Sequence, residues 1–192
     1  MLDMLNPSIE LGRSFVCAEY QRSFAPMLLL WCGIARFVEC SPQYAVLFGP
    51  VSISNSYCSA SRQLMVEYLS AHTAETRLAS QVRPRRPFRD HRGRSAPDAG
   101  VSFPGSLEEL SQTIAHIEPD HKGVPVLLRQ YLRLGGRILA FNLDREFGNV
   151  LDGLIMVDLR QVEATMLARY MGRSGTTAFR AYHALDSDWQ HA

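Results

Sequence analysis

The chain has 192 residues, of which 46% are hydrophobic and 20% are charged, and its formal net charge at pH 7 is +1. These values are those of a soluble globular protein with enough residues for one domain with a hydrophobic core. The near-neutral charge gives no general case for nucleic-acid binding. The longest apolar run, from Ala25 to Ala35, is shorter than the roughly 20 residues that a membrane-spanning helix needs.

The cysteines and histidines do not have the spacing of a metal site. The four cysteines are Cys17, Cys32, Cys40 and Cys58, with no Cys-x-x-Cys pair among them, and the six histidines show no ligand spacing either. We therefore expect free thiols, no disulfide framework and no metal. The N-terminus does not show a signal-peptide pattern. The expected location is the cytoplasm, with contact at the surface of the inner membrane left open.

The first predicted element is a strand from Ser8 to Val16, followed by a polar loop and a helix from Pro26 to Val38. Pro26 suits the first turn of a helix. The apolar residues that follow Pro26 recur at helical spacing. A strand, a loop and a helix N-terminus in this order form a common anion-binding arrangement.

A second strand is predicted from Tyr44 to Phe48 and is bounded by Gly49-Pro50, after which residues 51–54 could extend it beyond a bend. A helix capped by Ser59 or a neighbour should run to about Ala71. The stretch from Arg83 to Arg94 is rich in arginine and in helix-breaking residues, so it predicts a loop that continues through residues 95–105.

The second half of the chain predicts helices first and strands afterwards. The tetrapeptide Ser106–Glu109 is a capping box that opens a helix. A further helix spans about residues 125–134 and stops at Gly135-Gly136. Two strands are then predicted at residues 137–143 and 154–159, and two short helices near residues 162–170 and 176–182.

Several motifs, in the right order, resemble one family of enzymes. They are Glu10–Val16, Glu19–Arg22, Leu30–Ile34 and Leu47–Ser54, together with the later runs Gly123–Leu132 and Asp152–Leu159. These segments are similar to those of the ornithine-lipid-type N-acyltransferases, some of which are described as hemolysin-like proteins. The Glu10-x-x-Arg13 pair also resembles the Glu-x-Ser-Arg motif of acyl-homoserine-lactone synthases, with Gly12 where those enzymes have serine. The resemblance covers most of the chain and is poorest from about Ala71 to Gly105.

The resemblance implies an α/β (α+β) fold: the C-terminal part of a GNAT-like acyltransferase domain, with a mixed sheet flanked by helices and a helical C-terminal extension. Residues 1–71 would form its core, 72–105 a basic insertion loop, 106–160 the remaining helices and strands, and 161–192 the extension. A GNAT domain begins with a strand, two helices and two more strands, but only eight residues precede Ile9 here. We therefore expect a domain that is truncated at its start.

The resemblance also implies catalytic roles for Glu10 and Arg13. Glu10 would hold or deprotonate the amine acceptor, and Arg13 would order the active site. Attack of an amine on a thioester needs a neutral amine and hydrogen-bond donors for the developing oxyanion, but no covalent nucleophile. The alternative is that both residues are ordinary charges on an edge strand, where a spacing of three places them on opposite faces.

Donor binding is implied for Gln21 and Arg22, which match the start of the GNAT pyrophosphate loop. Phe24 and Pro26 stand where that loop normally has small residues. This departure favours the phosphopantetheine of acyl carrier protein over acyl-CoA as the donor, and no tightly bound cofactor is expected. The alternative is a loop that only caps a helix.

Two further stretches carry candidate binding residues. Ser52 and Ser54 begin a serine-rich cluster at the position where GNAT folds bind the pantetheine arm, although serine is also a common turn and cap residue. The arginines between Arg83 and Arg94 could contact an acidic carrier protein or anionic lipid head groups. The alternative for these arginines is a solvated loop.

The function that the resemblance implies is transfer of a 3-hydroxy fatty acyl group from acyl carrier protein to the α-amine of an amino acid, with ornithine as the favoured acceptor. Two alternatives stay open. One is an acyl-homoserine-lactone-like signal synthase, which would use S-adenosylmethionine as its acceptor. The other is an inactive fragment or a hemolysin-like protein without catalysis. The expected partners are acyl carrier protein and the acceptor amino acid, and not nucleic acid, while peripheral contact with membrane lipid is left open.

Overall fold

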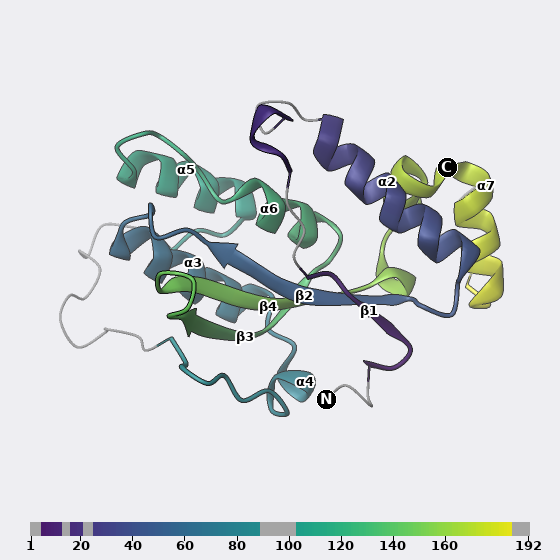
Figure 1. Cartoon of the computed structure of the whole chain (residues 1–192), viewed down its shortest axis with the longest axis horizontal. Coiled ribbons are helices and arrows are strands. Elements are labelled where there is room, and N and C mark those ends of the chain that lie inside the picture. The colour runs from purple at the N-terminus through teal and green to yellow at the C-terminus, as the bar shows by residue number, and fades with distance from the viewer. Residues whose placement is uncertain (1–4, 13–15, 21–24, 89–102, 186–192) are drawn as a thin grey trace. The chain divides into compact units, whose positions relative to one another are not determined.

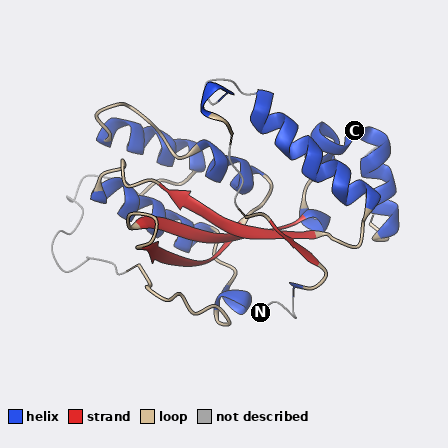
Figure 2. Ribbon diagram, viewed as in Figure 1, coloured by secondary structure: helices blue, strands red, loops and turns tan. Residues whose placement is uncertain are grey.

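The computed structural model describes residues 5–12, 16–20, 25–88 and 103–185 (Figure 1). The described residues form both helices and strands (Figure 2). The chain divides into two compact units, which are described separately below. Unit 1 is Pro50–Met156, and unit 2 combines Leu2–Gly49 with Val157–Ala192.

Four strands in the described part of the chain form one sheet. They are β1 (Ser8–Glu10), β2 (Val46–Ile53), β3 (Arg137–Asp144) and β4 (Val150–Asp158), in the spatial order β1-β2-β4-β3. β1 pairs in parallel with β2, whereas β3 and β4 form an antiparallel hairpin. The sheet is therefore mixed and is flanked by helices, which confirms the predicted fold class.

The first two strands differ from their predicted bounds. β1 ends at Glu10, so the prediction of a strand as far as Val16 was wrong; Leu11 still donates its N–H to the carbonyl of Phe48, at 2.7 Å, but lies outside the strand. β2 begins at Val46 rather than at Tyr44, and it passes through Gly49-Pro50 to Ile53, so the extension that the sequence left open is present as far as Ile53. Proline can stand in a strand where the ladder does not need its missing N–H.

Unit 1 contains four helices among its described residues: α3 (Ser59–His72), α4 (Thr76–Ala79), α5 (Leu107–Ile117) and α6 (Val126–Arg133). α3 packs against α5 and β3. The predicted Ser106 cap is confirmed, because Ser106 Oγ accepts from the Glu109 N–H at 3.1 Å. The reciprocal bond of a capping box is displaced by one residue: Glu109 Oε2 accepts from the N–H of Gly105, at 2.8 Å, and not from that of Ser106. The core of the unit includes Ile53, Met65, Leu69, Leu110, Ile114, Leu128, Leu151 and Ile155.

The predicted insertion loop contains structure that local sequence patterns did not indicate. Besides the short helix α4, the Glu75 N–H donates to the carbonyl of Ile138 at 3.1 Å, and the carbonyl of Arg86 accepts from the Leu143 N–H at 2.9 Å. Ile138, which accepts the first bond, and Leu143, which donates the second, belong to β3 at the edge of the sheet. An edge strand presents unpaired backbone groups, and two pieces of the insertion satisfy some of them here.

The β3–β4 hairpin shows why the fourth strand was predicted too short. β4 begins at Val150 and not at Leu154, and it includes Gly153, a residue that usually weakens a strand pattern. Phe141 faces Gly153 across the hairpin, and a Cβ on Gly153 would lie 3.2 Å from the Phe141 ring. The glycine makes room for an aromatic side chain from the other strand, which the local sequence does not reveal.

Unit 2 is built mainly from two helices, α2 (Ala25–Cys40) and α7 (Ala164–Tyr182), which pack side by side (Figure 1). The predicted pair of C-terminal helices corresponds to α7, which has a kink at Gly172, where φ is +71°. Glycine adopts this conformation without steric cost. The apolar face predicted for α2 is only partly correct, because Trp31 is buried whereas Leu29 is 70% exposed.

Two short 3-10 helices complete the described elements, η1 (Ala18–Tyr20) and η2 (Leu159–Gln161). None of the helices in the described residues combines the length and the apolar character needed to cross a membrane.

Candidate functional site

The candidate residues named from the sequence fall in different units. Glu10 is the last residue of β1, in unit 2. Ser52 lies near the end of β2 and Ser54 directly follows that strand, both in unit 1. Arg13, Gln21 and Arg22 lie outside the described residues, so the roles assigned to them stay predictions.

Glu10 stands on a part of β1 that approaches β2 closely. It is exposed and lies opposite Phe48 in the parallel pairing. Leu11, the next residue, approaches Gly49 of β2 so closely that a Cβ on Gly49 would lie only 2.3 Å from the carbonyl oxygen of Leu11. Position 49 of β2 therefore requires a glycine. This close pairing fixes the backbone that carries Glu10 and leaves the carboxylate open to solvent.

The hydroxyls of Ser52 and Ser54 both have protein partners. Ser52 Oγ donates to Oδ1 of Asp152, on β4, at 2.6 Å. Ser54 Oγ accepts from the Ser56 N–H at 3.1 Å, which is the bond of a serine turn. A hydroxyl has one donor and two acceptor sites, so each of these oxygens retains capacity for a further hydrogen bond.

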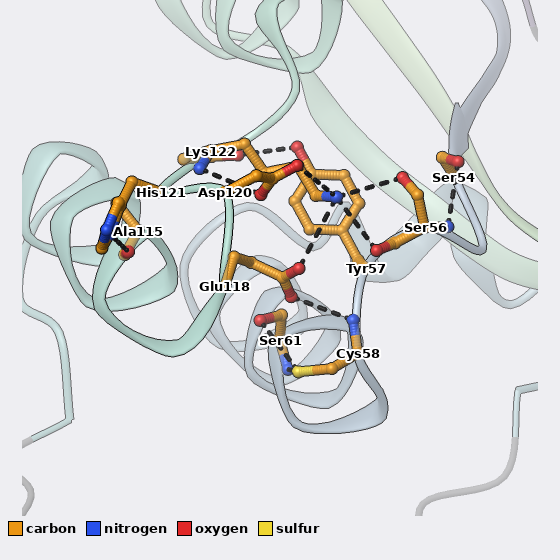
Figure 3. A network of polar contacts seen from close by, with 11 residues as sticks. Ser54, Ser56, Tyr57, Cys58, Ser61, Ala115, Glu118, Asp120, His121 and Lys122 are labelled. Carbon is orange, nitrogen blue, oxygen red and sulfur yellow. Dashed lines mark hydrogen bonds and ion pairs between the residues drawn. The ribbon is translucent and has the colours of Figure 1, made fainter.

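A larger polar network joins two loops of unit 1 (Figure 3). We call residues 54–58 the β2–α3 loop and residues 118–125 the α5–α6 loop. The side chain of Glu118 is 1% exposed, and its Oε1 accepts from the Cys58 N–H at 2.9 Å. Cys58 precedes α3, and its Sγ accepts from the Ser61 N–H at 3.5 Å. The cap of this helix is thus Cys58, a neighbour of Ser59, which was the residue named from the sequence. The buried carboxylate of Glu118 adds a favourable negative charge at the helix N-terminus.

Lys122, the only lysine of the chain, supplies the other half of the network. Its Nζ donates to the carbonyl of Ser56 at 2.9 Å, to Ser56 Oγ at 3.2 Å and to Asp120 Oδ2 at 3.2 Å. The same nitrogen lies 3.6 Å from Glu118 Oε2 and 4.6 Å from the centroid of the Tyr57 ring. The Tyr57 hydroxyl donates to the carbonyl of Gly123 at 2.7 Å. Each loop therefore donates hydrogen bonds to the other: Lys122 donates to Ser56, and Tyr57 and Cys58 donate to Gly123 and Glu118.

Sequence reasoning did not identify this network. Glu118 and Lys122 have the spacing of a helical ion pair, but Pro119 lies between them and removes any helical pattern. Their partners Cys58 and Ser56 are 60 and 66 residues away in the chain. The one visible signal was that Lys122 is unique.

Glu118 should make the stability of the protein depend on acid pH. The hydroxyl of Ser61 lowers the pKa of Glu118 below its ordinary value; burial opposes this shift, and Cys58 and Lys122 add to it. A carboxylate whose pKa is lowered by folding stabilises the folded state above its unfolded pKa, and this contribution is lost as the pH falls through the folded pKa.

We therefore expect the urea midpoint of the wild type to fall as the pH drops below the unfolded value of 4.5, and to fall less steeply in a Glu118→Gln variant. The difference between the two curves isolates Glu118 from the other carboxylates, and Glu146→Gln, at an exposed turn position, serves as the control. Parallel curves for wild type and Glu118→Gln would contradict the prediction.

The other residue classes give no further site in the part of the chain that the structure describes. Those residues include no group of three or more His, Cys, Asp and Glu side chains that could hold a metal ion. Cys17, Cys32, Cys40 and Cys58 all carry free thiols. In the arginine-rich stretch, Arg83, Arg85 and Arg86 are exposed, and residues 89–94 lie outside the described residues. A contact of this stretch with a carrier protein or lipid stays a prediction.

Comparison with known proteins gives two relatives. No family model and no solved structure matches the chain. The chain is 24% identical to a glycine N(α)-acyltransferase of Bacteroides thetaiotaomicron, in an alignment 181 residues long that covers 83% of the chain. It is 21% identical to a glycine N(α)-acyltransferase of Phocaeicola vulgatus, in an alignment 163 residues long that covers 81% of the chain. Each match covers 49% of the relative, so the chain spans about half the length of these proteins. By this similarity the chain is related to acyltransferases, without a distinction between the ornithine-lipid type and other members.

Proposed function

We propose that the chain acts in an N-acyltransferase that moves a fatty acyl group from a thioester to the amine of an amino acid. The observation that carries the proposal is the similarity to two glycine N(α)-acyltransferases over 81% and 83% of the chain. The mixed sheet with flanking helices and the exposed carboxylate of Glu10 at the end of β1 support it.

The proposed chemistry is direct aminolysis. An ammonium group has no lone pair, so the acceptor must lose a proton before its nitrogen attacks the thioester carbonyl carbon. In this proposal Glu10 holds the acceptor amine and accepts that proton, and Arg13 organises the site. The C–N bond forms through a tetrahedral intermediate, the C–S bond then breaks, and the leaving thiolate takes up a proton. The products are an N-acyl amino acid and a free thiol.

We propose a 3-hydroxyacyl carrier protein as the donor. Gln21 and Arg22 would bind its phosphate, and Ser52 and Ser54 would contact the pantetheine arm with the hydrogen-bonding capacity that their hydroxyls retain. Acyl-CoA is the alternative donor. The presence or absence of the adenosine diphosphate group distinguishes the two.

Two amino acids are proposed as acyl acceptors, each for a different reason. Ornithine is implied by the motifs that resemble the ornithine-lipid enzymes, and glycine is suggested by the names of the two relatives. Ornithine carries a second, cationic amine, whereas glycine has no side chain. A site that pairs with this second charge would reject glycine, because its own charged group would be left without a partner.

The test is an acyl-transfer assay on the purified chain. It uses 3-hydroxyacyl carrier protein or acyl-CoA with ornithine, glycine, S-adenosylmethionine or no acceptor, and it measures free thiol and acylated product by mass spectrometry. We expect equal amounts of thiol and N-acyl amino acid with ornithine or glycine. A lactone product from S-adenosylmethionine would favour the signal synthase instead. Thiol and product no higher than in a protein-free control would contradict activity of this chain alone.

A further inference from the structure

We propose that Glu118 and Lys122 form a clamp that positions the β2–α3 loop for binding of the acyl donor. The proposal rests on the proposed function, because that function assigns the neighbouring Ser52 and Ser54 to the donor. Lys122 is in this view a positioning residue. It acts on the donor through the loop and does not contact it.

The clamp holds the backbone of the loop at two points (Figure 3). Lys122 donates hydrogen bonds to the carbonyl and the hydroxyl of Ser56, and Glu118 accepts one from the N–H of Cys58. Ser54 and Ser56 are exposed, so apolar burial does little to determine the conformation of this part of the loop. Tyr57, the residue after Ser56, is 7% exposed and anchors the loop beneath the Lys122 ammonium group. Polar contacts from the α5–α6 loop therefore hold the backbone at Ser56 and Cys58, while Asn55 is bound through its side chain to the carbonyl of Gly148 and to Arg62.

The charges around Lys122 argue against a direct role in binding the donor phosphate. Two carboxylates, those of Glu118 and Asp120, lie 3.6 Å and 3.2 Å from its Nζ and outnumber its single positive charge. A phosphate would meet a net negative field here. The ammonium group has three N–H donors, and Ser56 and Asp120 already occupy them. The side chain is thus committed to holding the loop.

A loop that is ordered before the donor arrives does not lose its conformational freedom on binding, and preorganisation of this kind raises affinity. Loss of the clamp should therefore weaken donor binding more than it slows the chemical step. In kinetic terms, the KM for the donor rises while kcat and the KM for the amino acid stay close to the wild-type values.

The test compares three substitutions at the clamp. Lys122→Met keeps an aliphatic stem over Tyr57 but removes the charge and the donors. We expect the KM for 3-hydroxyacyl carrier protein to rise about tenfold, with kcat within about threefold of wild type. Lys122→Arg should restore part of the loss. A double variant with Lys122→Met and Glu118→Gln keeps an acceptor for the Cys58 N–H and leaves no buried carboxylate without its cation, so it tests the clamp if the single variant fails to fold.

The matched control is Arg137→Met, which removes an ion pair with Glu75 at 3.8 Å elsewhere in unit 1. This variant should leave the KM for the donor unchanged. An equal rise of the KM in the control would overturn the specific role of Lys122.

A second readout does not depend on turnover. Hydrogen exchange of residues 54–62, measured without substrate, should be faster in the clamp variants than in the wild type and the control. Unchanged exchange overturns the clamp, and faster exchange with an unchanged KM for the donor overturns its role in donor binding. If the wild type shows no acyl transfer, the proposed function fails. Affinity for 3-hydroxyacyl carrier protein, measured by calorimetry, then replaces the KM: equal affinities in wild type and Lys122→Met overturn the inference, and weaker binding by Lys122→Met supports it.

Discussion

A Glu10→Gln variant is expected to lose acyl transfer by about 10²- to 10⁴-fold in kcat, because an amide cannot accept the proton of the acceptor amine. The substitution preserves the size and shape of the side chain. Glu10 is exposed at the end of β1, so we expect the free energy of unfolding to change by less than about 0.5 kcal/mol. The measurements are kcat with saturating carrier-protein donor and urea unfolding of the same preparation.

The control for Glu10 is Glu146→Gln, an identical change at an exposed position in the turn between β3 and β4. It should leave both kcat and stability at wild-type values. Undiminished transfer by Glu10→Gln would exclude Glu10 as the group that accepts the proton. The remaining explanation would be the ordinary charge on an edge strand that the sequence left open.

A Gly49→Ala variant is expected to lower the free energy of unfolding by about 3 kcal/mol, near the upper end of what overpacking costs. The new Cβ would lie 2.3 Å from the carbonyl oxygen of Leu11 and 3.0 Å from its carbon. These are backbone atoms, and the Leu11 N–H is bonded to the carbonyl of Phe48, so they cannot move aside as a side chain would. β1 and β2 must separate, and Glu10 must shift with β1. Urea unfolding measures the loss of stability.

Gly33→Ala is the matched control, because it adds the same methyl group at an exposed position of α2. A Cβ at Gly33 would meet no atom within 4 Å. Alanine is the better helix former, so we expect this variant to be more stable than wild type by about 0.5–1 kcal/mol. If Gly49→Ala is as stable as wild type, the close approach of β1 and β2 does not constrain the fold.

Helices were the part of the fold that the sequence predicted best. α2 begins next to Pro26, Ser106 caps α5, and α6 ends shortly before Gly135, where φ is +72°. Each of these features depends on residues within a few positions of one another, so a local pattern contains the necessary information. The sequence also predicted two helices in the region of α7, which is a single element with a kink at Gly172.

Strand bounds were predicted less well, because a strand is defined by its partner. β2 passes through Gly49-Pro50, and β4 includes Gly153, although both would be expected to interrupt a strand. Only the facing residues explain these choices: Leu11 requires a glycine at position 49, and the Phe141 ring requires one at position 153. Neither neighbour is close in sequence to the glycine it constrains.

The same division applies to the candidate site. The sequence by itself predicted a mixed α/β fold and motifs that resemble those of acyltransferases, and it named Glu10, Ser52 and Ser54 as candidate residues. Only the tertiary structure decided how the β2–α3 loop is held, since Glu118 and Lys122 lie 60 and 66 residues from their partners in that loop. Hydrogen bonds and ion pairs between loops depend on where the folded chain brings the groups together, and no local spacing contains that information.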